Sequence, residues 1–122
     1  HIDNNHKGLI PSQIDELNNI LSEISKFFII IERTIAENNY SDVDKNIEIQ
    51  HKVLFTLDTY RKNQIKRIKR EEVGTKNSLL YFNIITEIKN LLLHTINLLK
   101  SQRDFVNYNS SENKLTLNEN AK

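Results

Sequence analysis

The sequence contains no cysteine, no methionine and no tryptophan, and it has one proline and two glycines in 122 residues. Without cysteine, the chain can form no disulfide, no thiolate metal site and no thiolate nucleophile. The shortage of glycine and proline argues against a fold of many strands, because strand connections usually need such turn residues. The absence of methionine in a chain that begins with His1 predicts a fragment or a processed piece of a longer protein.

Long apolar runs are also missing. The longest uninterrupted run extends from Phe27 to Ile31, far short of the roughly 20 residues that a membrane-spanning helix requires. The N-terminal segment has no apolar centre of the kind that a signal peptide needs. With 38% apolar residues, 27% charged residues and a net charge of +1, the composition predicts one soluble helical domain whose overall charge favours no class of partner.

The first periodic segment predicts a helix over residues 11–38. Pro11 suits the first position of a helix, and Ser12 with Asp15 has the spacing of a capping box. Apolar residues then recur in steps of three and four, which is typical of a helix with one buried face. These residues are Ile14, Leu17, Leu21, Ile24, Phe28, Ile31 and Ile35.

Two further helices are expected over residues 42–73 and 77–105. Ser41 or Asp42 can cap the second helix, and Gly74 is placed for a left-handed C-cap. The expected buried side of the second helix consists of Val43, Ile47, Leu54, Leu57, Tyr60, Gln64 and Ile68.

Short turns make neighbouring helices antiparallel, so the sequence predicts an all-α, up-down-up bundle of three long helices. Thr75, Asn77 or Ser78 can cap the third helix. Residues 1–10 are expected to form an extended lead-in, and residues 106–122 a polar tail outside the bundle.

The third helix carries more apolar surface than a three-helix bundle needs. Its apolar residues cover an arc of roughly 160°, whereas a surface helix usually needs about 100°. Two explanations are open: scattered exposed apolar residues, or a second interface that serves a homodimer or docking onto the rest of a parent chain. The width of the arc favours the second interface, which is expected to use Ile85, Leu92, Ile96 and Leu99.

A polar line follows the same helix through Asn83, Glu87, Asn90, His94 and Asn97. It can be an ordinary solvated face, or Glu87, Asn90 and His94 can contact a metal ion or an anion. Because no matching pair of ligands is evident on another helix, Glu87 and His94 are weak metal candidates, and the sequence predicts no cofactor.

A basic segment ends the second helix and contains Arg61, Lys62, Lys66, Arg67, Lys69 and Arg70. Such a segment can complement the helix dipole, or it can dock onto anionic lipid or a protein partner. Nucleic acid is excluded as the expected partner, because the domain is nearly neutral and lacks interleaved aromatic residues. No phosphate-binding loop, nucleophile elbow or metal-binding helix motif is present, so the sequence predicts no enzyme.

The third helix also resembles a known family. The stretch "NSLLYFNIITEIKNLLLHTINLLK" resembles the third helix of the PhoU-like repeat, and His94 with Asn97 matches its H-x-x-N step. From Ile2 to Phe105 the chain is similar to the soluble C-terminal part of bacterial PiT-type inorganic phosphate transporters. The family's acidic pair falls on Lys89 and Leu93 here, so the metal clusters known in the family are not expected.

The resemblance implies a cytosolic regulatory or oligomerisation domain of a phosphate transporter, on the cytoplasmic side of the inner membrane of a bacterium. The expected partners are a second copy, the transmembrane part of the parent transporter and an anionic lipid surface. Two alternatives stay open: a free-standing helical adaptor that binds a partner helix, and a metal- or phosphate-binding sensor that uses Glu87, Asn90 and His94.

Overall fold

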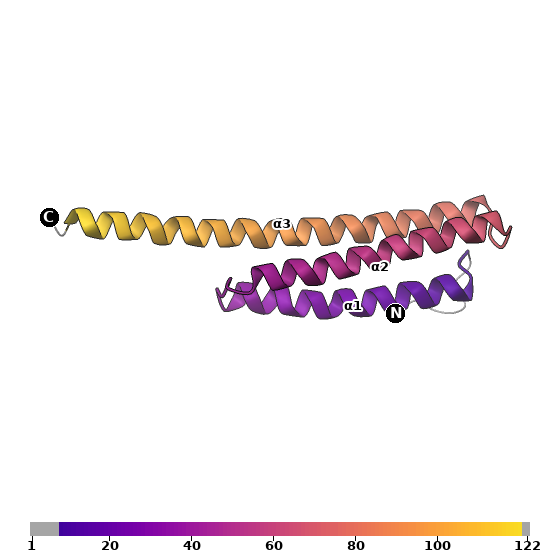
Figure 1. The fold of residues 1–122 in the computed structure, drawn as a ribbon, viewed down its shortest axis with the longest axis horizontal. Coiled ribbons are helices and arrows are strands. Elements are labelled where there is room, and N and C mark those ends of the chain that lie inside the picture. The colour runs from indigo at the N-terminus through magenta and orange to yellow at the C-terminus, as the bar shows by residue number, and fades with distance from the viewer. Residues whose placement is uncertain (1–7, 121–122) are drawn as a thin grey trace.

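The fold consists of three α-helices, as a computed structural model shows (Figure 1). The structure describes the backbone of residues 8–120 and the side chains of residues 8–110. Helix α1 spans Pro11–Ala36, α2 spans Val43–Lys69 and α3 spans Thr75–Asn120, with no strand between residues 8 and 120. The all-α prediction is therefore confirmed. Residues 1–7 of the expected lead-in lie outside the described residues.

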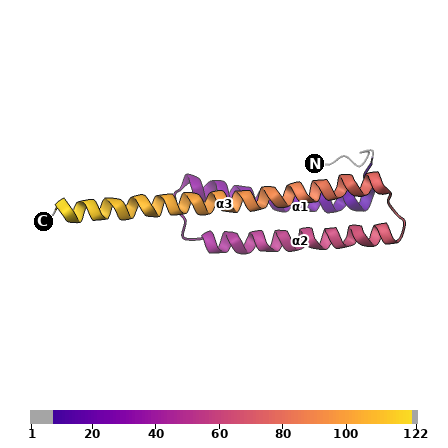
Figure 2. The same cartoon turned by 90° about the horizontal axis from the view of Figure 1, so that it is seen from above.

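The three helices lie side by side and alternate in direction (Figures 1 and 2). Helix α2 packs closely against both other helices, whereas α1 and α3 touch each other less. One end of the bundle therefore combines the start of α1, the end of α2 and the start of α3. Among the described residues, no helix combines the length and the apolar content needed to cross a membrane.

Helix α1 begins as predicted at Pro11, but Gln13 provides the capping interaction. The side-chain oxygen of Gln13 accepts a hydrogen bond of 3.0 Å from the backbone N–H of Ile10. The predicted capping box of Ser12 and Asp15 is wrong, because both residues already lie inside the helix. Gln13 occupies the third helical position, from which a side chain can reach back to the residue before the helix.

Helices α1 and α2 both end in Schellman motifs, with residues other than glycine in the left-handed conformation. Asn38 has a φ of 51° after α1, and Glu71 has a φ of 58° after α2. The backbone N–H of Glu72 donates to the carbonyl of Arg67, and that of Asn39 donates to Thr34. These bonds satisfy carbonyls that a helix end leaves unpaired.

Gly74 does not cap α2, which corrects the sequence-based prediction. It directly precedes α3, and its carbonyl accepts hydrogen bonds from both the backbone N–H and the hydroxyl of Ser78. Gly74 is therefore the residue just before the third helix that accepts its first backbone hydrogen bond, while Glu71 takes the left-handed position that ends the second.

The hydrophobic core runs along the inside of the three helices. Its largest fully buried side chains are Phe27 and Tyr81, and all three helices contribute aliphatic residues. The remaining members are Leu9, Ile14, Leu17, Ile20, Ile24, Ile31, Val43, Val53, Leu57, Ile85, Ile88, Leu92, Ile96 and Leu99.

Helix α3 extends well past the other two helices (Figures 1 and 2). The sequence analysis ends this helix near Phe105, whereas the structure continues it to Asn120. The expected polar tail over residues 106–120 is therefore helical backbone. Polarity alone does not end a helix, and no proline or glycine occurs in this stretch to end it.

The Glu71→Gly variant is expected to be more stable than the wild type by about 0.5–1 kcal/mol, because a left-handed residue with a Cβ is strained and glycine is not. Asn38→Gly is the matched control at the same motif position, and a smaller gain is expected there because asparagine tolerates this conformation. Urea unfolding monitored by circular dichroism measures both changes. A loss of stability in Glu71→Gly would contradict the assignment of strain.

Candidate functional site

A buried cluster of polar side chains joins all three helices at the end where α2 leads into α3. We call it the polar cluster. Five of its members are almost fully buried, which is unusual for residues of most of these types. The cluster consists of Gln13 and Glu16 from α1, Gln64 and Arg67 from α2, and Asn77, Ser78 and Tyr81 from α3.

An ion pair between Arg67 and Glu16 forms the charged half of the polar cluster. The guanidinium lies 2.6 Å from the carboxylate, and the two side chains are 9% and 12% exposed. The same carboxylate oxygen accepts a hydrogen bond of 2.6 Å from the hydroxyl of Tyr81. Its other oxygen accepts a bond of 2.8 Å from the side-chain amide of Asn63. Three donors therefore stabilise the Glu16 charge.

Arg67 makes two further contacts that hold its guanidinium in place. It donates to the side-chain oxygen of Gln64 over 3.0 Å. Its guanidinium carbon lies 5.5 Å from the centre of the Tyr81 ring, which is within the range of a cation–π interaction.

Three amide side chains form the neutral half of the polar cluster. Gln13 donates to Gln64 over 2.8 Å and to Asn77 over 2.7 Å. Asn77 donates in return to Gln13 and also to the backbone carbonyl of Gly8. Within the described part of the chain, no buried side-chain nitrogen or oxygen is left without a hydrogen-bond partner. A fully paired network of this kind fixes the helices in one arrangement.

Tyr81 keeps its proton throughout the physiological range. Burial raises the pKa of its phenol, and the Glu16 carboxylate raises the pKa further, although Arg67 partly opposes both effects. The phenol therefore acts as a hydrogen-bond donor and offers no base. The Glu16 and Arg67 charges compensate each other, so the polar cluster stabilises the positions of the three helices.

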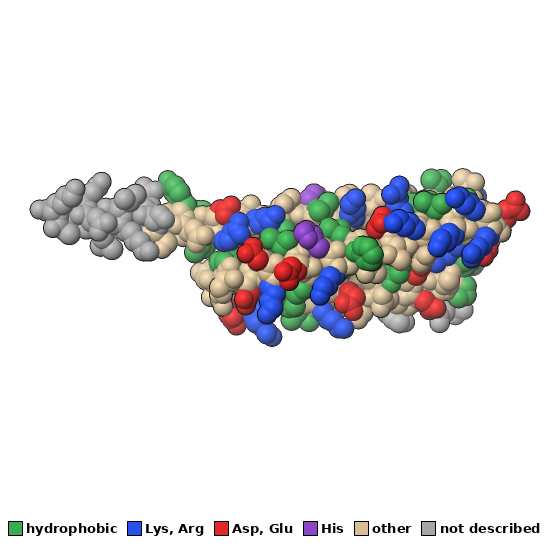
Figure 3. Space-filling view, in the orientation of Figure 1, with side chains coloured by type: hydrophobic (Ala, Val, Ile, Leu, Met, Phe, Trp, Pro, Cys, Tyr) green, Lys and Arg blue, Asp and Glu red, His purple; other side chains and the backbone are tan. Residues whose placement is uncertain are grey.

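The predicted basic patch is smaller than the sequence suggests. Arg67 is buried in the polar cluster, and Lys62 pairs with Asp58 over 3.1 Å at the surface. The other four residues, Arg61, Lys66, Lys69 and Arg70, are exposed. Lys and Arg side chains gather over this end of the molecule, where α2 leads into α3 (Figure 3).

The predicted interface residues of α3 lie in the bundle core. Ile85, Leu92, Ile96 and Leu99 are all at most 5% exposed, so they are not available to a second molecule in the folded bundle. The sequence analysis identified them correctly as one apolar face. It could not tell which part of the broad arc α1 and α2 would cover.

The polar line of α3 is exposed along its whole length, from Asn83 through Asn90 to Asn97. Glu87 and His94 lie on this exposed surface too. Between residues 8 and 110, no group of three or more His, Asp or Glu side chains comes together in a way that could hold a metal ion. The structure brings no further ligand to the two weak metal candidates.

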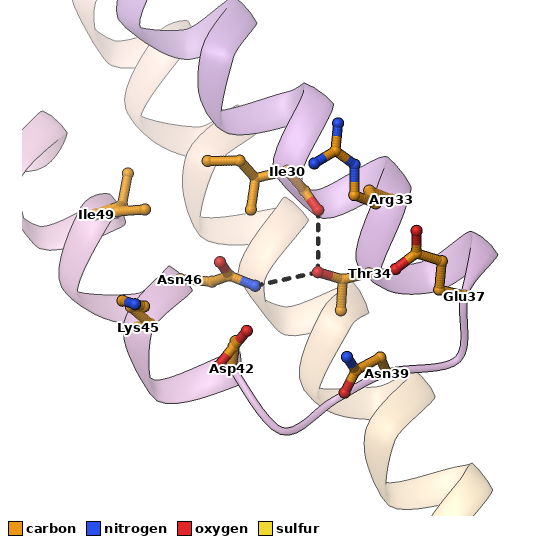
Figure 4. A pocket seen from close by; sticks show the side chains of 9 residues that line it. All are labelled: Ile30, Arg33, Thr34, Glu37, Asn39, Asp42, Lys45, Asn46 and Ile49. Carbon is orange, nitrogen blue, oxygen red and sulfur yellow. Dashed lines mark hydrogen bonds between the residues drawn. The ribbon is translucent and has the colours of Figure 1, made fainter.

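A hollow of about 340 Å³ lies beside the turn between α1 and α2 (Figure 4). Its floor contains Asn46, which donates to the Thr34 hydroxyl over 3.4 Å. Arg33, Glu37, Asp42 and Lys45 surround it, and none of these four forms an ion pair with another described residue. The sequence analysis missed this site, since nothing in the spacing of these residues distinguishes them from ordinary surface charges. The hollow could accept a small ligand that carries both charges.

Exposed apolar side chains remain on the outside of α3 after the bundle has formed. Leu91 is 47% exposed and Leu98 is 53% exposed, and Phe105 is 62% exposed beyond the other helices. Leu79 and Leu93 are exposed as well. Apolar side chains that gather on one helix indicate a contact surface more strongly than single exposed residues do.

Comparison with protein-family models, with characterised proteins and with solved structures finds no match to this chain.

The Tyr81→Phe variant is expected to lose about 1–2 kcal/mol of stability near pH 8, because a buried hydrogen bond to a charged carboxylate is removed. In the unfolded chain the phenol ionises near its ordinary pKa of 10.0, whereas the folded protein keeps the proton to higher pH. The wild-type advantage is thus complete below pH 10 and shrinks above it, by about 1.4 kcal/mol per pH unit.

Urea unfolding of both proteins between pH 8 and about pH 11 measures this difference, and the other titrating groups cancel because both proteins share them. Tyr108→Phe is the matched control, since its side chain is exposed and its removal is expected to change stability little at any pH. A constant difference between wild type and Tyr81→Phe across this range would contradict the prediction.

Proposed function

We propose that this bundle is a non-catalytic docking module that associates with a second copy of itself. The observation that carries the proposal is the apolar surface that remains on the outside of α3, including Leu91, Leu98 and Phe105. A helix of a soluble bundle gains nothing from exposing these side chains to water. Burial of these side chains against another protein surface lowers the free energy, because it removes apolar area from water.

The polar cluster supports a structural rather than a chemical role for the buried residues. Its charges are paired with each other, and Tyr81 retains its proton. A catalytic acid or base needs a pKa near the working pH and access to a substrate. Tyr81 meets neither condition, and Asn63, Arg67 and Tyr81 already occupy the Glu16 carboxylate.

We further propose that the module is the cytosolic regulatory domain of an inorganic phosphate transporter, on the cytoplasmic side of the inner membrane. The resemblance of residues 77–100 to the PhoU-like repeat supports this narrower assignment. The exposed residues Arg61, Lys66, Lys69 and Arg70 also support it, because each basic side chain near an anionic membrane surface contributes about 1 kcal/mol of binding free energy.

A free-standing adaptor that binds a partner helix is the second candidate function. A shallow groove of about 330 Å³ favours it, because the groove is lined by Ile68, Leu79 and Phe82 where α2 leads into α3. The third candidate, a metal- or phosphate-binding sensor, has the least support, because Glu87, Asn90 and His94 are exposed and do not line a pocket together. Calorimetry with zinc, iron, magnesium and phosphate tests that third alternative.

The two main candidates differ in the protein that carries the bundle in native cells. An antibody to the bundle is expected to detect a band several times heavier than 14.4 kDa that stays in the membrane pellet after alkaline carbonate washing. A band near 14.4 kDa that the wash extracts would contradict the transporter assignment and leave the adaptor.

Self-association is expected to double the mass of the purified chain from 14.4 kDa as its concentration rises from about 1 to 200 µM, the range in which modest interfaces assemble. Sedimentation equilibrium measures this mass directly. High salt is expected to leave the dimer intact, because the proposed contact is apolar. A mass of one chain over the whole range would contradict self-association.

A further inference from the structure

Helix α3 is longer than the bundle to which it belongs. It has 46 residues, against 26 in α1 and 27 in α2, which corresponds to about 70 Å against about 40 Å. Its last fully buried core residue is Leu99. The far part of α3 extends past the ends of α1 and α2 and has no neighbouring helix among the described residues (Figures 1 and 2). A helical segment without tertiary contacts is only marginally stable in water, so this part of α3 needs a partner.

Four apolar side chains form one line on the outside of α3, and we call them the α3 strip. They are Ile84, Leu91, Leu98 and Phe105, each seven residues after the one before. Ile84 is half-buried, and the other three are exposed. A repeat of seven is the spacing with which two α-helices pack along a shared seam. The strip begins over the bundle and continues onto the free part of α3.

The surface beside the α3 strip carries little charge. At 100° per residue, Glu87, His94 and Tyr108 are the exposed titratable residues of α3 on this side between residues 80 and 109. The other charged residues of this segment lie roughly 120° or more around the helix from the strip. They are Lys89, Lys100, Arg103 and Asp104. Depletion of charge at the centre of a surface is characteristic of protein–protein interfaces.

We propose that the α3 strip binds the same strip of a second copy in an antiparallel, two-fold symmetric dimer. The symmetry axis lies between His94 and Thr95. This register pairs Leu91 with the partner's Leu98, and Ile84 with the partner's Phe105, and each pair occurs twice. The register covers all four residues of the strip. The inference rests on the proposed self-association and adds its geometry.

The antiparallel direction follows from the ends of α3 and from its charges. In this arrangement residues 100–109 of each copy lie along the partner's bundle, so the free part of each helix gains the neighbour that it lacks. A parallel pair would place the two copies of Glu87 side by side, and would do the same with His94. Like charges in contact are unfavourable, whereas the antiparallel register places Glu87 beside the partner's Gln102.

Charged substitutions in the α3 strip test which surface is used. The Leu91→Glu, Leu98→Glu double variant is expected to stay at the mass of one chain in sedimentation equilibrium, because four carboxylates would meet in the interface. Both residues are half exposed, so circular dichroism is expected to show an intact bundle. Ile29→Glu with Phe55→Glu is the matched control at exposed apolar sites elsewhere, and it is expected to dimerise like the wild type.

The outcomes separate the two proposals. A wild-type dimer that survives the strip substitutions would overturn the inference and leave self-association standing. If only the control substitutions disrupt the dimer, the inference is likewise overturned and self-association still stands. A wild-type chain that stays monomeric would overturn both, and the adaptor function would then be the one to pursue.

The absence of cysteine in the chain allows a test of direction. An equimolar mixture of the Leu91→Cys and Leu98→Cys variants is expected to form a disulfide-linked dimer on mild oxidation, because these positions face each other across the antiparallel interface. Either variant alone is expected to cross-link poorly, since like positions are then about 10 Å apart along the helices and a disulfide needs Cα atoms within about 7 Å. Efficient cross-linking of each variant alone would indicate a parallel pair and overturn the inference.

Discussion

The contact between Arg67 and Glu16 is the interaction on which the arrangement of the three helices depends. Removing two charges from water is costly, and their attraction offsets the cost only when the geometry is good and the remaining donors and acceptors are satisfied. Here the carboxylate has three donors, and the guanidinium has an amide and an aromatic ring in addition. These conditions hold only when α1, α2 and α3 occupy their observed positions together.

Apolar contacts alone would specify this bundle less tightly. Leucine and isoleucine side chains can pack in several registers at similar free energy, whereas a buried charge that misses its partner is strongly unfavourable. A second set of polar contacts lies further along the bundle, where Asn46 donates to Thr34 and Gln50 donates to the backbone carbonyl of Leu92. The core therefore combines apolar layers, which stabilise the folded state, with polar layers, which select one arrangement of it.

The number of helices and the turns between them could be predicted from the sequence, because apolar periodicity and the turn residues near Asn38 and Gly74 agree, whereas the end of α3 at Asn120 could not. The first helix begins at Pro11 as expected. These predictions depend on local sequence, which is where pattern arguments are strongest.

The buried side of α2 could not be predicted in the same way. Sequence reasoning placed Ile47 and Ile68 on it, whereas Asn46 and Arg67 are the buried residues. A hydrophobic pattern favours apolar residues, and it is misleading where a polar residue is buried with partners from other helices. The hydrogen-bond partners of Asn46 and Arg67 in α1 lie 12 and 51 residues away along the chain, so no local window contains the signal. The left-handed conformation of Glu71 was not predicted either, because glycine is the residue that favours this conformation and Gly74 lies nearby.

The length of α3 has a mechanical consequence. Its first turns are held by Asn77, Ser78 and Tyr81 in the polar cluster, while its far end lies about 70 Å away. When a partner holds the free part of α3 in its helical form, a tilt of about 5° at the cluster would displace the far end by about 6 Å. The bundle therefore holds one end of α3, and the other end moves the most. A change in hydrogen bonding too small to alter the core would become, at the tip of α3, a movement larger than the width of a side chain.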